Sequence, residues 1–260
     1  MPSTFFGWIG YLLKQYGPLF LSGTLSTLFI ALTGTVLGFI VGLLVALGKT
    51  IPVSKRDPFA KKLWVRPLQW LLNIYVEVFR GTPMIVQAMV IYYGTMMYTP
   101  ISMTPLAASL LIVSVNTGAY MAEIIRGGII SVDKGQSEAA HAIGMTHAQA
   151  MINVILPQAV RNIMPSIGNE FVVNIKDSSV LNVISVSELY FVSKSAAGTY
   201  YKYFEVFFIT ACIYFILTFT VTRILRLVEK KLEGPDHYVI YGSQSDSRAE
   251  IHYSQKAEEE

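Results

Sequence analysis

The stretch SEAAHAIGMTHAQAMINVILP, residues 137–157, is polar and rich in alanine, and strongly apolar segments lie on both sides of it. It contains Glu138-Ala139-Ala140, then Gly144, and finally Val154-Ile155-Leu156-Pro157. Alanines leave a thin helical surface that can enter the groove of a partner protein. The spacing of these residues, taken alone, also fits an ordinary amphipathic loop that lies on a membrane surface.

The local residue types predict a helix–turn–helix within this stretch. Ser137 can cap a short first helix, because a hydroxyl accepts a hydrogen bond from the free backbone amides of the first turn. Gly144 permits the sharp turn that follows. Thr146 and Gln149 have the spacing of a capping box for a second helix. Pro157 is expected to weaken the end of that second helix and to redirect the chain.

The composition of the whole chain indicates a membrane protein. Only 14% of the 260 residues are charged and the mean hydropathy is +0.48, whereas soluble domains carry about 25% charged residues. The net charge of +3 gives no indication of a nucleic-acid partner. Residues 5–16 are aromatic and read as an interfacial helix. Five apolar segments follow, and the fold class they predict is an all-α integral membrane protein with spans at 19–47, 68–98, 105–123, 163–189 and 203–222.

Basic residues predict the orientation of these spans. Residues 49–66 hold six Lys or Arg and one acid, Asp57, and short basic loops stay in the cytoplasm. The N-terminus is then outside and the C-terminus is cytoplasmic, as is the loop at about 131–160. We therefore predict one transmembrane domain over 19–233, an interfacial segment over 1–18, and a polar, disordered cytoplasmic tail over 234–260.

Polar groups inside the predicted spans are the candidates for substrate contact, because such groups are costly in a membrane unless they face an interior or a partner. Glu170, Asn174 and Asp177 share one helical face and could hold a cationic group. Pro83 should break the second span, which could expose backbone groups near it. The further candidates are Asn116, Gln87, Thr82 and Gly81.

Structural roles remain open for the same residues. Glu170 or Asp177 could simply pair with a basic neighbour, for which the candidates are Arg161, Lys176 and Arg80. The pairs Glu77–Arg80 and Glu123–Arg126 are each three residues apart and are interpreted as ion pairs on a helix surface.

Several other signals are discounted. Gly48-Lys49-Thr50 resembles the end of a phosphate-binding loop, but position 43 is leucine where that motif needs glycine. His141 and His147 are six residues apart, which does not suit a metal site on one helix face. No nucleophile, base and orienting acid have a recognisable arrangement. We therefore expect no metal site and no catalytic site in this chain.

Several motifs together resemble the permease subunits of bacterial ABC importers, in the branch that takes up polar amino acids. Residues 137–157 resemble the EAA loop of that family. Further similarity lies in Phe79-Arg80-Gly81-Thr82-Pro83, in Glu123 to Gly128, and in Lys176-Asp177-Ser178-Ser179. The resemblance covers about residues 18–233. Val154 stands where the family more usually has isoleucine.

The resemblance implies a type I importer architecture in the bacterial cytoplasmic membrane. Two permease subunits, identical or different, would form one path, and an extracytoplasmic amino-acid-binding protein would deliver the substrate. Separate ATPase subunits would hold ATP and magnesium and dock onto Glu138, Ala139, Ala140, Gly144, Leu156 and Pro157. The acidic face favours arginine, lysine, histidine or glutamine as substrate. The alternatives are an importer for another small solute, or an ion channel or membrane scaffold that does not use the loop for transport.

Overall fold

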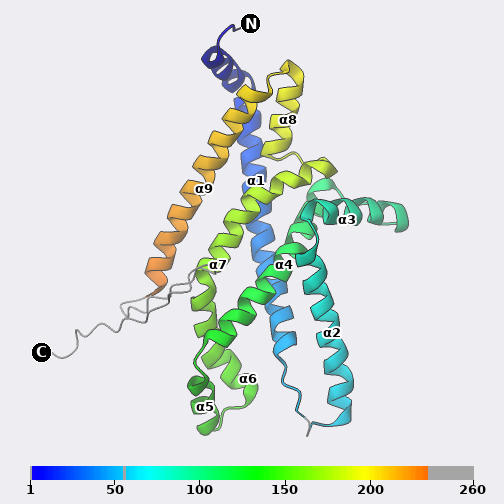
Figure 1. Ribbon diagram of the computed structural model, residues 1–260, viewed down its shortest axis with the longest axis vertical. Helices are drawn as coiled ribbons and strands as arrows, with labels where there is room; N and C mark the ends of the chain where they lie inside the picture. The colour runs from blue at the N-terminus through cyan, green and yellow to red at the C-terminus, as the bar shows by residue number, and fades with distance from the viewer. Residues whose placement is uncertain (1, 55–56, 234–260) are drawn as a thin grey trace, which may run out of the picture.

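The computed structural model describes residues 2–54 and 57–233, and all regular secondary structure in them is helical. No strand occurs in this part of the chain, so the all-α prediction is confirmed. The predicted tail over 234–260 lies outside the described residues. The helices are, in chain order, α1 (Phe5–Thr50), α2 (Phe59–Gly81), α3 (Met84–Tyr98), α4 (Pro105–Ser131), α5 (Lys134–Ala142), α6 (His147–Ala150), η1 (Met151–Ile155), α7 (Leu156–Asp177), η2 (Ser178–Ile184), α8 (Leu189–Tyr200) and α9 (Tyr203–Glu233) (Figure 1).

Helix α1 joins the predicted interfacial segment and the first predicted span in one element of 46 residues. Thr4 caps it, because its hydroxyl accepts a hydrogen bond from the Gly7 amide at 3.2 Å. Pro18 lies inside the helix near its N-terminal end. At 1.5 Å per residue the helix is about 69 Å long, more than twice the thickness of a hydrocarbon core of about 30 Å. It can therefore begin outside the core and still cross it.

Small residues bring α1 against α4 along the centre of the molecule. Gly34, Gly38 and Gly42 follow one another at four-residue spacing on the buried face of α1. A Cβ added at Gly38 would lie 2.7 Å from the Cβ of Thr117, and one at Gly42 would lie 2.5 Å from the Cβ of Met121. Both distances are shorter than real side chains adopt. The glycines therefore let the two backbones approach closely, as small residues do between membrane helices.

The second predicted span is broken at Thr82 and Pro83, as the sequence predicts. Pro83 has no backbone donor and cannot continue α2. The axes of α2 and α3 meet at 113°, and α3 extends sideways from the bundle (Figure 1). Residues 68–98 therefore do not form one straight helix, and the pair is either a broken span or a re-entrant loop.

Three predicted connections differ from the structure. The basic loop over 49–66 is shorter than predicted, because α1 continues to Thr50 and α2 begins at Phe59; its residues 55–56 lie outside the described part. The helix predicted over 163–189 ends earlier, since the chain enters a 3-10 turn after Asp177 and Ser185 is left-handed with a φ of 63°. Residues 190–202, which connect the fourth and fifth predicted spans, are mostly helix α8.

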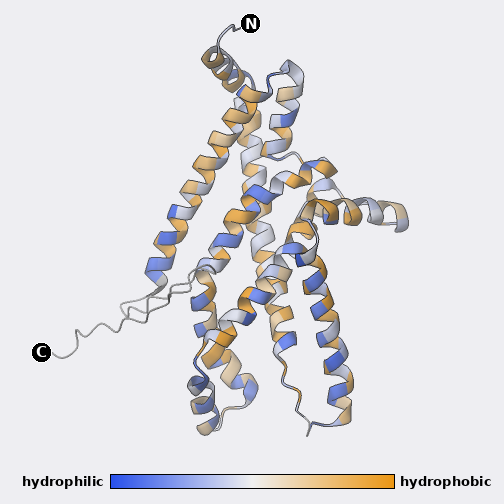
Figure 2. Ribbon diagram, in the orientation of Figure 1, coloured by the Kyte–Doolittle hydropathy of each residue, from blue (hydrophilic) through white to orange (hydrophobic). Residues whose placement is uncertain are grey.

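Three helices of the described chain are long and apolar enough to cross a membrane, namely α1, α4 and α9 over residues 203–231. The bent α2–α3 pair adds a fourth if it counts as one span. Helix α7 is not among them; it carries Glu170, Lys176 and Asp177. Figure 2 shows polar stretches along α7 and a largely apolar α9. The number of five spans and the orientation of the termini stay predictions.

The glycine contact between α1 and α4 gives a first testable prediction. Replacing Gly38 by isoleucine should reduce the stability of the protein in detergent by about 1–3 kcal/mol, because the new side chain must displace Thr117. The measurement is the fraction of monodisperse protein after heating. The matched control is Gly10→Ile in the same helix, where an added Cβ has no neighbour within 4 Å. Equal losses for the two variants would contradict the contact.

Candidate functional site

The alanine-rich stretch forms two helices joined by a tight turn, as predicted. The first helix, α5, begins earlier than expected: its N-cap is Asp133, whose carboxylate accepts a hydrogen bond from the Gly135 amide at 2.7 Å. Ser137 lies within α5, so the prediction that Ser137 caps it is wrong. Gly144 has a φ of +87°, in the left-handed region that favours glycine. The turn after α5 therefore depends on this residue.

The second helix of the loop continues without a break into α7. The predicted capping box is confirmed: the Thr146 hydroxyl accepts from the Gln149 amide at 3.3 Å, and the Thr146 amide donates to Gln149 Oε1 at 2.9 Å. One π-helical turn, η1, then leads into α7. Pro157 has no backbone donor, and the π-helical turn lies directly before it. The helical backbone nevertheless continues past Pro157, so the prediction that the helix ends and the chain is redirected there was wrong.

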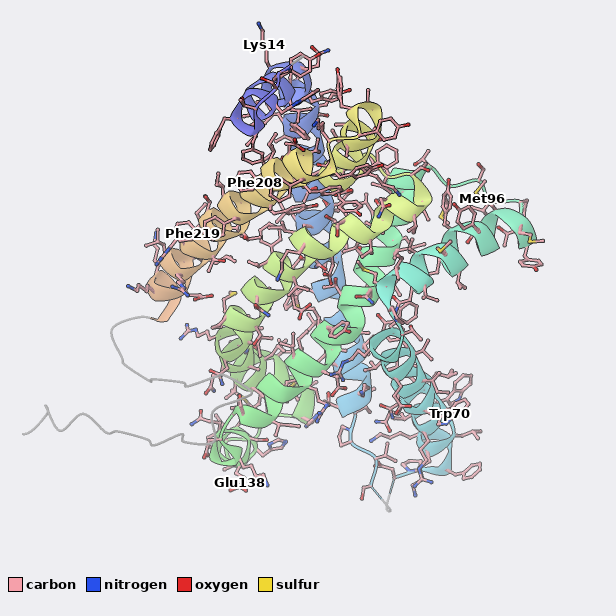
Figure 3. The ribbon with its side chains drawn as sticks, turned by 45° about the horizontal axis from the view of Figure 1, so that its top comes forward. Lys14, Trp70, Met96, Glu138, Phe208 and Phe219 are labelled. Carbon is pink, nitrogen blue, oxygen red and sulfur yellow. The ribbon has the colours of Figure 1, made fainter. Side chains whose placement is uncertain are left out.

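The loop projects from one end of the bundle, and Glu138 is at its tip (Figure 3). Glu138, Ala139 and Gly144 are exposed, whereas Ala140 is buried. Ile143 of the same turn is a large apolar side chain that is 75% exposed. Sequence reasoning did not single out Ile143. The loop is held to the bundle by a small apolar cluster of Val132, Ile155 and Ala159.

The side-chain amides of Gln87 and Asn116 form hydrogen bonds at the break between α2 and α3. The Gln87 amide nitrogen donates to the carbonyls of Phe79 and Thr82, at 2.9 Å each, and the Thr82 hydroxyl lies 2.9 Å from it. Asn116 of α4 donates to Gln87 Oε1 at 2.8 Å. Both amides are buried. The backbone groups released at the break are thus bonded within the chain, while Gly81 is exposed beside them.

Asn174 ties three helices together. Its amide nitrogen donates to the hydroxyl of Thr35 on α1 at 2.9 Å, and its side chain exchanges hydrogen bonds with the Thr117 hydroxyl on α4 at 3.0 and 3.1 Å. Asn174 is only 4% exposed. The structure therefore brings it close to the α1–α4 contact, although it shares a helical face with Glu170 and Asp177.

The carboxylates of Glu170 and Asp177 form no ion pair within the described residues. Glu170 is partly buried and Asp177 is exposed. Glu170 is close enough to Asp177 and to Arg80 for direct electrostatic interaction. The Arg80 guanidinium lies 5.6 Å from the centre of the Tyr120 ring on α4. Glu170 thus interacts with a second carboxylate of α7 and with a guanidinium of α2, whereas Asp177 interacts with Lys176.

One predicted ion pair forms and the other does not. Glu123 binds Arg126 at 2.9 Å, as predicted, and also binds Lys49 at the end of α1 at 2.6 Å. The Lys49 and Glu123 side chains are 12% and 20% exposed. This mostly buried ion pair therefore connects α1 to α4. The pair predicted between Glu77 and Arg80 was wrong. The Arg80 side chain turns toward Tyr120.

Glu188 is a buried carboxylate whose role the sequence analysis missed. It caps α8 and accepts hydrogen bonds from the amides of Tyr190 and Phe191, at 2.9 and 2.7 Å. It also accepts from the Tyr214 hydroxyl on α9 at 3.1 Å. The only sequence signal is an acid directly before a helix, a common capping position. Glu188 therefore fastens α8 to α9.

These features define a helical membrane protein with a projecting two-helix loop. Its own side chains bond the backbone groups that are freed where a helix breaks. Residues 59–234 match the family model described as "Binding-protein-dependent transport system inner membrane component". The chain is 35% identical over 219 residues to the arginine transport system permease protein ArtQ of Bacillus subtilis, covering 84% of this chain and 94% of the relative. It is 32% identical to the glutamine transport system permease protein GlnP of Escherichia coli, covering 83% and 94%.

Solved structures agree with these relatives. A chain from the crystal structure of an amino acid ABC transporter with histidines superposes with a TM-score of 0.75 and is 38% identical, covering 89% of this chain and 100% of that chain. A chain of the inward-facing MetNI methionine ABC transporter gives a TM-score of 0.69 at 18% identity, covering 84% and 98%, which shows the shared fold alone.

The chain therefore belongs to the family of binding-protein-dependent transport system inner membrane components. It is a permease subunit of an ABC importer for amino acids and a multi-pass protein of the bacterial inner membrane. In this family the ATPase is on separate subunits, and the transporter works with a binding protein.

The buried cap at Glu188 gives a second prediction. Glu188→Ala should reduce stability in detergent by about 2–4 kcal/mol, because it removes a helix cap and leaves the donors of α8 and Tyr214 without an acceptor. Glu188→Gln keeps an acceptor and should lose less. The measurement is thermal unfolding followed by intrinsic fluorescence. Glu205→Ala is the control, since Glu205 makes a loose pair with Lys202 at 3.6 Å. Equal losses for the alanine variants would contradict this role.

Proposed function

We propose that this permease imports a polar amino acid, preferably a cationic one, and that its exposed loop couples the transport path to ATPase subunits. The observation that carries the substrate part is the pair of carboxylates without an ion pair, Glu170 and Asp177, of which Glu170 is within electrostatic range of Arg80. The relatives named for arginine and glutamine transport support a polar amino acid.

The proposed topology has five spans, with the N-terminus outside and the C-terminus in the cytoplasm. The spans are α1, the bent α2–α3 pair, α4, α7 and α9. The N-terminus and the α5–α6 loop lie at opposite ends of the molecule, which supports this arrangement (Figure 1). Basic residues on α2 and at the end of α9 support placing the loop in the cytoplasm.

The proposed coupling surface is the tip of the loop. Glu138, Ala139 and Gly144 are exposed there, and the exposed Ile143 adds an apolar contact point. Leu156 and Pro157 lie farther along, where η1 joins α7. The partners would be two ATPase subunits that hold ATP and magnesium, a second permease subunit of the same or a different kind, and an external binding protein. This chain itself would bind no cofactor and catalyse no reaction.

The proposed cargo site combines charges of both signs. A cationic side chain or an ammonium group would bind Glu170 and Asp177, and Arg80 would bind the carboxylate that every amino acid carries. Tyr120 holds the Arg80 guanidinium in place. Lysine and histidine fit the acidic face as well as arginine does, and glutamine would use the ammonium group alone.

We propose that the uncharged residues predicted to contact the substrate complete this cargo site. Gln87, Asn116 and Thr82 shape the break, and Asn174 fixes the height of α7 against α1 and α4. Gly81 is exposed at the break and leaves room for a substrate beside the backbone. Direct contact of these residues with the substrate stays a prediction.

A third prediction tests the coupling loop. Glu138→Lys and Gly144→Pro should each abolish most substrate-stimulated uptake in vesicles while the chain still inserts, because one reverses a charge at the docking tip and the other removes a φ of +87°. The measurement compares uptake with ATP hydrolysis by the complex. Glu205→Lys makes the same charge change on α9 and should leave both unchanged. Normal uptake by the two loop variants would contradict coupling through this loop.

A fourth prediction separates the two charges of the cargo site. Asp177→Asn should weaken arginine uptake about 10-fold or more and glutamine uptake much less, since a charged hydrogen bond contributes about 1.5–3 kcal/mol. Arg80→Gln should weaken both, because both substrates carry a carboxylate. Competition of labelled uptake measures the two affinities, with Glu205→Gln as control. Equal losses of both substrates in Asp177→Asn would indicate a structural role for Asp177. Competition by a solute other than an amino acid would favour another cargo.

A further inference from the structure

A groove lies between α7 and α9, and neither Glu170 nor Asp177 lines it. It encloses about 290 Å³, and a second hollow of about 240 Å³ continues it along the same two helices. The hollows share Val172, Thr222 and Arg226, so they form one trough. Neither hollow belongs to the coupling loop or to the cargo site.

The first hollow is cationic at one end and apolar along its wall. Lys176, Arg223 and Arg226 line it together with Val172, Phe215 and Phe219. None of the three cations takes part in an ion pair in the described chain. The Arg223 guanidinium lies 4.9 Å from the centre of the Phe219 ring, which holds it against the groove wall. One acid, Glu229, lines the adjoining hollow.

Lys176 and the two arginines approach each other because α7 and α9 run in opposite directions. Pro165 and Gly168 of α7 share the second hollow with Leu225 and Glu229 of α9, whereas Lys176 shares the first with Phe215. Side chains on a helix lean toward its N-terminus. The long Lys176 side chain therefore leans toward the level of Arg223. Around α7, Lys176 lies about 100° from Asp177 and about 120° from Glu170, and its charge interacts with that of Asp177.

This groove opens on a face that the chain leaves uncovered. Only 17% of the apolar stretch of α9 is buried, compared with 67% for α4. Figure 2 shows the apolar length of α9 ending in polar residues near its C-terminal end, and Figure 3 shows Phe219 on that helix. Because α9 spans the membrane, the groove runs from membrane depth toward the bilayer surface. The apolar walls suit the acyl chain of a phospholipid, and the cluster of cations into which they lead suits its phosphate.

We infer that the α7–α9 groove binds an anionic phospholipid. Its phosphate would lie among Lys176, Arg223 and Arg226, and an acyl chain would pack along Phe215 and Phe219. Basic pockets between membrane helices bind anionic headgroups in this way. The inference does not depend on which amino acid is carried, because neither Glu170 nor Asp177 lines the groove. Failure of the cargo proposal would leave it intact.

The experiment measures phosphatidylglycerol retention by the full chain, purified in detergent with its partner subunits. Native mass spectrometry should detect bound phosphatidylglycerol but no phosphatidylcholine, and added phosphatidylglycerol should raise the melting temperature. Arg223→Gln with Arg226→Gln should weaken this binding about 25-fold, since each cation contributes about fivefold. The matched control is Lys230→Gln with Lys231→Gln on the same helix, which should weaken it less than fivefold. Unchanged melting temperature in phosphatidylcholine shows that both double variants fold.

Four results would overturn the inference. The first is equal retention of phosphatidylglycerol by the two double variants. The second is equal stabilisation by inorganic phosphate, which would make the acyl chain irrelevant. The third is binding that appears only after residues 234–260, which end in three glutamates, are removed, because the tail would then be the occupant. The fourth is a disulfide between two copies carrying Phe219→Cys and Cys212→Ser, which would place a second permease in the groove.

Discussion

The close contact of α1 with α4 is the constraint on which the other helices depend. Gly34, Gly38 and Gly42 remove the side chains that would hold the two backbones apart. In a membrane the lipid chains are as apolar as leucine, so the attraction must come from close packing and hydrogen bonds and not from expulsion of water. Lys49 and Glu123 then fix the same two helices at one end with a partly dry ion pair.

Other elements attach to this central pair through buried polar groups. Asn174 holds α7 through hydroxyls of both α1 and α4, and Tyr75 of α2 donates to the Val115 carbonyl of α4 at 2.6 Å. Gln87 satisfies the carbonyls that Pro83 leaves free. Because a polar group without a partner is expensive at membrane depth, such bonds select one arrangement of helices. The charges that remain unpaired, notably Glu170 and Asp177, are then the ones available for another molecule.

Local chemistry made part of this structure predictable from the sequence. The break at Pro83, the left-handed Gly144 and the Thr146–Gln149 capping box each depend on a few neighbouring residues, and all three are confirmed. The cap by Asp133 was missed because two capping residues, Asp133 and Ser137, compete within one turn of helix. Periodicity and charge likewise placed an acidic face on α7, although they could not show which of its members are already bonded.

Contacts between distant residues could not be predicted. The partner of Lys49 lies 74 residues away, and that of Tyr214 lies 26 residues away. Glu188 falls inside the span predicted over 163–189, and its two amide donors become available only because α8 starts there. Arg80 similarly had a nearer acid in sequence, Glu77, but turns toward an aromatic ring on another helix.

The unbroken helical backbone from Thr146 to Asp177 connects the proposed coupling loop to the proposed cargo site. Sequence reasoning placed a weak point at Pro157, which would have isolated the loop from the membrane helices. The structure instead has helical backbone through α6, η1 and α7. Helices transmit displacement along their axis better than loops do, because each turn is bonded to the next. A force on the loop would therefore move Glu170 relative to Arg80. The π turn at Met151–Ile155 and Pro165 inside α7 are places where such a helix can bend.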